Sequence, residues 1–122
     1  MPTKSACVIA GATPDQVRPV GANDTLVLRA NRLGTLVTGR PGDLVVDYAF
    51  TFEGPVYDVM WNAETHWFAV TIYRGEQAVR WDNRAPEDAG YPRVEDVLGA
   101  TTPRTILEAL DVPADAIGYA ET

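Results

Sequence analysis

The sequence predicts an α+β protein that consists mainly of an antiparallel β-meander of five to six strands, curved or partly closed into a barrel, followed by short C-terminal helices. Two observations predict this class. Short runs of β-branched and aromatic residues alternate with dense turn signals. These signals fall at residues 11–14, 21–24, 39–42, 53–55 and 74–76. Beyond residue 101, the spacing of the apolar residues changes from alternating to helical.

Length and composition favour a single domain that covers residues 1–122. Hydrophobic residues make up 46% and charged residues 22%, which is typical of a globular chain. We expect residues 1–82 to be mainly β-strands, 83–101 a loop or short turn, and 102–119 the C-terminal helices. No apolar run approaches the 18 or so residues that span a bilayer, and the first residues lack the apolar stretch of a signal peptide. We therefore expect a soluble, cytoplasmic protein.

The register of the central strands follows from the positions of their apolar residues. We expect strands at 43–52, 56–61, 67–74 and about 77–82, joined by loops at 53–56, 63–66 and 75–76. Apolar residues occupy mainly the even positions of 43–52 and the odd positions of 56–61. With these loop lengths, apolar residues face one another across every pair of strands. The sequence thus predicts one buried row that contains Phe50, Val59, Val70 and Trp81.

The flanking segments are predicted from local signals. Residues 4–10 form a strand, 25–30 and 33–38 form a hairpin around Asn31 and Arg32, and 39–42 form a type II turn. The segment 13–20 remains ambiguous. Thr102 is a helix N-cap followed by Pro103 at the first helical position, so we expect a helix to about residue 111. Further short turns are expected at 93–98 and 113–119.

The opposite face of the predicted sheet carries the candidate binding residues. In the expected register Asp58, Thr71 and Arg80 form one row, while Trp67 and Tyr73 project from the same face. Large aromatic side chains on a polar face are typical of interaction surfaces. We therefore predict that Trp67, Tyr73, Asp58 and Arg80 form a binding surface. The alternative is that the N-terminal strand or the loop 83–100 covers both rings as a second small core.

The charge distribution excludes two classes of partner. The net charge is −7, of which residues 1–81 carry −1 (8 acids, 7 bases) and residues 82–122 carry −6 (9 acids, 3 bases). Without a basic cluster, we expect neither nucleic-acid binding nor binding to an anionic membrane. An acidic surface keeps a protein soluble, and it also suits a basic partner.

No catalytic, metal or cofactor motif is present in the sequence. Cys7 is the only cysteine and lies in an apolar run, so we expect it to be a buried hydrophobic residue. His66, the only histidine, lies in a predicted hairpin loop near Glu64, without a set of ligands around it. We therefore predict no catalytic residue, no metal site and no cofactor.

The function expected from these observations is a non-catalytic interaction or regulatory module that binds a protein partner or associates with itself. An acidic inhibitor or an accessory factor is one form of such a module. The alternative is a small-ligand-binding β-barrel, or a small enzyme with a site around Asp58, Arg80 and His66. A deep pocket with convergent polar groups favours this alternative, whereas an exposed aromatic patch favours the interaction module.

Overall fold

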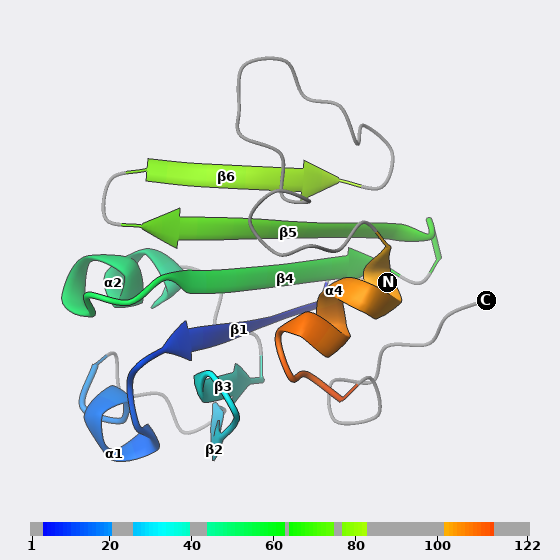
Figure 1. The fold of residues 1–122 in the computed structure, drawn as a ribbon. Helices are drawn as coiled ribbons and strands as arrows, with labels where there is room; N and C mark the ends of the chain where they lie inside the picture. The colour runs from blue at the N-terminus through cyan, green and yellow to red at the C-terminus, as the bar shows by residue number, and fades with distance from the viewer. Residues whose placement is uncertain are drawn as a thin grey trace.

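The protein folds as a six-stranded antiparallel sheet with helices on both faces (Figure 1). The computed structural model describes residues 4–20, 26–39, 44–62, 64–74, 77–82 and 102–113. The strand order is β2-β3-β1-β4-β5-β6, and the described strands do not close into a barrel. The strands are β1 (Lys4–Ala10), β2 (Val27–Ala30), β3 (Gly34–Thr38), β4 (Val56–Asn62), β5 (Trp67–Arg74) and β6 (Gln77–Asp82). The helices are α1 (Pro14–Val17), α2 (Leu44–Thr51) and α4 (Pro103–Ala109).

The register predicted for the last three strands is confirmed. Val59 lies opposite Val70, and Val70 lies opposite Trp81. The predicted strand at 4–10 and the hairpin around Asn31 and Arg32 are also present, as β1 and as β2 with β3. Tyr57, Val59 and Trp61 of β4 lie opposite Ile72, Val70 and Phe68 of β5, so the large apolar residues of the two strands share one face.

The prediction of a strand at 43–52 is wrong, because this segment forms helix α2. Val45, Tyr48 and Ala49 are buried, which is one face of a helix rather than one face of a strand. Phe50, predicted to be a core residue, is 67% exposed. The segment is nearly all apolar, so its pattern fits both periods, and packing against the sheet decides between them.

Strand β1 occupies the place beside β4 that the sequence had assigned to 43–52. Ala6 lies opposite Val59, so the buried row runs through Ala6, Val59, Val70 and Trp81. The fold is therefore not a simple meander, because β1 lies between β3 and β4. Both faces of β1 are buried, as expected for a central strand.

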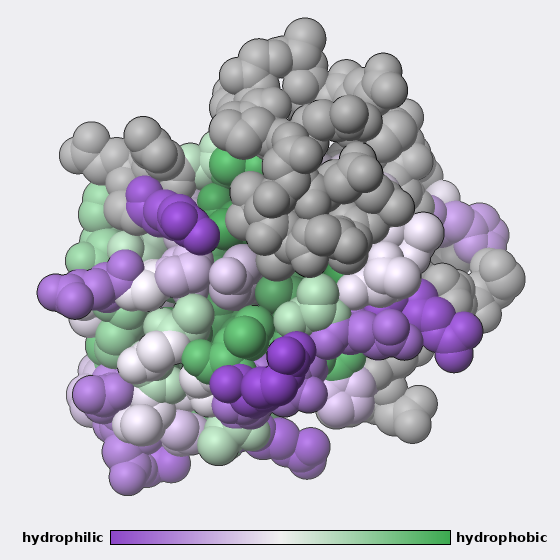
Figure 2. Space-filling view, viewed as in Figure 1, coloured by the Kyte–Doolittle hydropathy of each residue, from purple (hydrophilic) through white to green (hydrophobic). Residues whose placement is uncertain are grey.

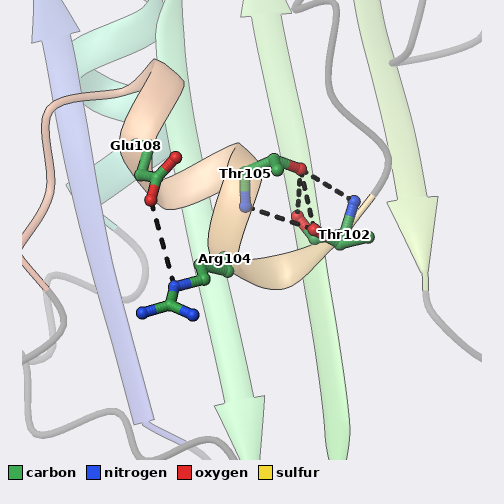
Figure 3. A network of polar contacts seen from close by, with 4 residues as sticks. All are labelled: Thr102, Arg104, Thr105 and Glu108. Atoms are coloured by element: carbon green, nitrogen blue, oxygen red, sulfur yellow. Dashed lines mark hydrogen bonds and ion pairs between the residues drawn. The ribbon is translucent and has the colours of Figure 1, made fainter.

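Helix α4 covers one face of the sheet, which we call the α4 face (Figure 3). Its core consists of Ala6, Val8, Leu36, Tyr57, Val59, Trp61, Phe68, Val70, Ile72 and Trp81 with Ile106, Leu107, Leu110 and Val112. The predicted N-cap is confirmed, since Thr102 Oγ1 accepts a hydrogen bond from the amide of Thr105 at 3.2 Å. The Thr105 hydroxyl in turn accepts one from the amide of Thr102 at 3.1 Å. The cap fixes where α4 begins and so orients its apolar stripe towards the sheet.

Helices α1 and α2 cover the other face, which we call the α2 face. Its core consists of Cys7, Ile9, Ala12, Val17, Val37, Val45, Tyr48, Ala49 and Val56. Helix α1 begins with a capping box between Thr13 and Gln16 and has Pro14 at its first position. In Figure 1, α2 lies at the end of the sheet where β4 begins.

The turn of the β2–β3 hairpin holds the end of α4. The Asn31 side chain donates to the carbonyl of Leu110 at 3.0 Å, and the Arg32 amide donates to Asp111 Oδ2 at 2.7 Å. The Arg32 guanidinium also donates to the carbonyl of Ala109 at 3.2 Å. The bonds from the Asn31 side chain and the Arg32 guanidinium satisfy carbonyl groups at the helix end, which have no partner within the helix.

Several predicted turns lie outside the described residues. They are residues 40–42 of the type II turn, the loop 75–76, the turn 93–98 and residues 114–119.

Candidate functional site

The residues predicted for the polar face form one row across the sheet. Asp58 lies opposite Thr71, and Thr71 lies opposite Arg80. On the other side of Asp58, Cys7 of β1 continues the row. Paired residues project from the same side of a sheet. The row therefore places a thiol, a carboxyl, a hydroxyl and a guanidinium group on the α2 face.

Asp58 is a buried carboxyl group with an unsatisfied atom. It is 7% exposed, and its Oδ1 atom has no hydrogen-bond partner. Burial raises the pKa of Asp58 to about 6, and the positive charge of Arg80 partly opposes this rise. Carboxyl groups that titrate near neutral pH are concentrated at functional sites. Asp58 is thus a candidate functional group on chemical grounds.

The side chains of Arg80 and Trp67 form a cation–π pair. The guanidinium carbon of Arg80 lies 5.8 Å from the centre of the Trp67 ring, which is a cation–π geometry. Arg80 is exposed and Trp67 is half-buried. Arg80 lies in the same row as Asp58, and its positive charge favours the charged form of Asp58.

Tyr73 lies at the edge of the core beneath α2. It is half-buried and packs against the cluster of the α2 face. Burial raises the pKa of Tyr73, the negative charge of Asp58 adds to the rise, and Arg80 opposes it. Tyr73, Asp58 and Arg80 therefore lie within electrostatic reach of one another.

Trp67 and Tyr73 do not form a fully open patch on the α2 face, because both rings are half-buried. The alternative prediction, in which both rings belong to a second small core, describes this face in part. The covering elements are α1 and α2, whereas the N-terminal strand lies within the sheet as β1. The loop 83–100, named in the same alternative, lies outside the described residues.

The most exposed apolar side chains on this side of the molecule belong to α2. Phe50 is 67% exposed and Val46, one helical turn earlier, is 45% exposed. The sequence reasoning missed this surface because it assigned both residues to the core of a strand. The signal that could have found it is the spacing of Val45, Tyr48, Ala49 and Phe52, which marks the opposite side of a helix as buried.

The surroundings of α2 are acidic. Residues 41–73 contain five acidic residues and no lysine or arginine, which gives a net charge of −5. Asp47, within α2, and Glu53, two residues after its end, are exposed. Figure 2 shows apolar surface beside hydrophilic residues at the edge of the molecule where Figure 1 places α2. The outer side of α2 therefore carries exposed apolar side chains close to two exposed acidic residues.

Cys7 and His66 occupy separate places. Cys7 is buried, and burial together with the charge of Asp58 raises the pKa of its thiol. His66 is exposed in the turn between β4 and β5, where its backbone has φ +55°. Asn62, at the start of that turn, lies four positions after Asp58 along β4, which is roughly 13 Å of extended chain. Within the described residues, no three His, Cys, Asp or Glu side chains form a group suited to a metal ion.

Comparisons with protein-family models, with curated proteins and with solved structures found no match. Among the described helices, none is long and apolar enough to cross a membrane.

Proposed function

We propose that the protein is a non-catalytic binding module and that the outer side of α2 contacts its protein partner. The observation that carries this proposal is the exposure of Phe50, with Val46 beside it on the same side of the helix. A large aromatic ring is costly to leave in water, and aromatic residues are enriched among those that dominate binding energy. Short helices that display apolar residues at i and i+4 spacing are a recurring recognition element.

The proposed partner is a protein with a positively charged surface and an apolar pocket. The negative charge around α2 supports this choice, because complementary charge speeds association and favours the correct partner. The same charge disfavours self-association through α2, since two copies would bring like charges together. An acidic inhibitor or accessory factor is consistent with this chemistry.

The four residues predicted from the sequence lie on the face of the sheet on which α2 packs, not on the outer side of α2. Arg80 is exposed, and its guanidinium lies over the half-buried ring of Trp67. Asp58 and Tyr73 lie deeper on the same face. We expect Trp67 and Arg80 to contribute less to binding than Phe50, because each already has a contact within the chain.

The second candidate function is a small-ligand site or enzyme built around Asp58. The buried carboxyl group with its unsatisfied oxygen favours this candidate. His66 is part of the same alternative, but it lies in the turn beyond the far end of β4 and would not share the site with Asp58. A ligand site would lose activity with Asp58→Asn and keep it with Phe50→Ser, whereas the binding module predicts the reverse.

The test is quantitative affinity capture from the native cell extract, with the tagged protein and a matched pair of variants. Phe50→Ser removes the exposed ring, and Val27→Ser removes another exposed apolar side chain on the edge strand β2. We expect Phe50→Ser, and not Val27→Ser, to abolish capture of one specific protein.

That protein, once purified, should bind the Phe50→Ser variant at least about tenfold more weakly. Its affinity for the wild type should fall as the salt concentration rises. If Phe50→Ser captures the same proteins in the same amounts as the wild type, the proposal is wrong.

A further inference from the structure

The α2 face contains a buried acidic side chain, Asp58, whose charged form is unfavourable in a buried position. Asp58 is 7% exposed, lies in the middle of the strand β4, and has an oxygen atom without a hydrogen-bond partner. Placing an unpaired carboxylate in apolar surroundings is strongly unfavourable, whereas a neutral carboxyl group is far less so. The stability of this face must therefore depend on whether Asp58 carries a proton.

Helix α2 packs against the strands that surround Asp58. It contacts β4 and β5, and its Tyr48 is 1% exposed within the cluster that contains Cys7. Burial is the main cause of the raised pKa values of Tyr48 and Cys7; charge on Cys7 adds to the rise at Tyr48, and charge on Asp58 adds to the rise at Cys7. We take α2, which packs on both β4 and β5, as the element whose movement away from the sheet would admit water to Asp58.

The charged and titratable groups around Asp58 do not neutralise it. Cys7 on β1, Tyr73 on β5 and Tyr48 on α2 are neutral near pH 7, and Asp47 on α2 is another acid. The positive charge of Arg80 on β6 favours the charged form of Asp58, and the Arg80 guanidinium lies over the Trp67 ring. The pKa of Asp58 accordingly remains raised, at about 6.

We propose that Asp58 is a proton-operated latch of the α2 face: the neutral carboxyl group lets α2 close on the sheet, and the charged carboxylate favours a state in which α2 opens and water reaches Asp58. Short helices at the edge of a fold open more readily than central strands, which makes α2 the element to respond. Because α2 carries Phe50 and Val46, the latch would also regulate the proposed partner surface. That consequence rests on the proposed function, whereas the latch itself does not.

The direction of the effect follows from proton linkage. The folded state holds a proton on Asp58 up to about pH 6, whereas an exposed aspartate loses it near pH 3.9. Opening of α2 therefore becomes more favourable as the pH rises through this range and levels off above it. For a fully hydrated Asp58 in the open state, the opening constant increases about tenfold between pH 5 and pH 7.

The test uses hydrogen exchange and carboxyl titration on the full chain, without any partner. After correction for intrinsic exchange rates, the α2 amides should open about tenfold more often at pH 7 than at pH 5. The amides of α4, on the other face, should not share this dependence. The carboxyl carbon of Asp58 should titrate near pH 6 by NMR.

Matched variants separate the latch from general effects of charge. Asp58→Asn keeps the shape and stays neutral, so its α2 opening should not change with pH in this range. Asp47→Asn, on the exposed side of α2, should behave as the wild type does. Arg80→Met should raise the pKa of Asp58 further.

Two results would overturn the proposal: titration of Asp58 at an ordinary value near 3.9, or pH-dependent opening that is equal in α2 and α4. Both are measured on the wild type, so they decide the matter even if a variant fails to fold. Failure of the Phe50→Ser capture experiment would leave the latch untouched.

Discussion

The α4 face and the α2 face of the same sheet differ in what they bury. The buried residues of the α4 face are apolar or aromatic. Three polar side chains are buried among the described residues, and all project from the α2 face of the sheet: Thr35, Asp58 and Thr71. Thr35 donates to the carbonyl of Ala12 at 2.7 Å, whereas Asp58 leaves one oxygen unpaired. The comparison indicates that the α4 face stabilises the fold, whereas the burial of Asp58 makes the α2 face less stable.

The two faces also differ in how α4 and α2 are held. Helix α4 has a capped start and a bonded end, since Thr102 caps it and Arg32 donates to its last carbonyl groups. Helix α2 presents Val46 and Phe50 to solvent and packs on β4, the strand that carries Asp58. Natural proteins concentrate such locally unfavourable features at functional sites. We therefore place both the binding surface and the latch on the α2 side.

The largest expected effect contrasts an aromatic residue of each helix-covered face. Trp81 is 8% exposed on the α4 face and lies 6.1 Å, centre to centre, from the Phe68 ring in an edge-on contact. Trp81→Ala should lower the free energy of unfolding by about 3–5 kcal/mol, because it leaves a cavity. Phe50→Ala should change it by less than about 0.5 kcal/mol, because the ring is mostly in water. Urea denaturation of both variants measures the contrast, and equal losses would contradict it.

The next effect concerns the buried acid of the α2 face. Asp58 has a raised pKa, so its contribution is most favourable below about pH 4 and is lost as the pH rises through about 6. A shift of about two units corresponds to about 3 kcal/mol. Asp58→Asn should therefore match the wild type near pH 4 and exceed its stability near pH 7 by up to that amount.

The measurement is the difference in unfolding free energy between this variant and the wild type across the pH range, which cancels the other acids. A difference that does not vary with pH would show that Asp58 titrates normally.

The contrast between the faces also explains how much the sequence could predict. Strands β4, β5 and β6 were predicted with their register because Val59, Val70 and Trp81 alternate with polar or small residues. The N-cap at Thr102 was predicted because a cap is local chemistry. The site row of Asp58, Thr71 and Arg80 followed from the same alternation.

The segment 43–52 could not be assigned because Leu44, Val46, Phe50 and their neighbours satisfy both periods. The place of β1 could not be predicted either, because no local signal links Ala6 to Val59, 53 positions later. The burial of Asp58 depends on both unpredicted elements, since β1 flanks it and α2 packs on its strand. The sequence therefore predicted Asp58 as a residue of the polar face, but it could not predict that Asp58 is buried.

A smaller effect concerns the N-cap of helix α4. Thr102→Ala removes the hydroxyl that accepts from the Thr105 amide, and should lower the free energy of unfolding by about 1 kcal/mol. Arg104→Ala is the control, because its ion pair with Glu108 spans 3.9 Å between largely exposed groups and contributes little. Thermal unfolding of both variants measures the difference, and a cap variant as stable as the control would contradict the role of Thr102.

The smallest effect concerns His66, which belongs to neither face. Its backbone has φ +55°, a left-handed conformation that asparagine adopts more readily than most residues. His66→Asn should therefore keep the turn between β4 and β5, and the free energy of unfolding should stay within about 0.5 kcal/mol of wild type. We expect capture of the partner to be unchanged as well, since the proposed contact lies on α2. A loss of binding of more than about tenfold would instead assign a functional role to this turn and move the candidate surface away from Phe50.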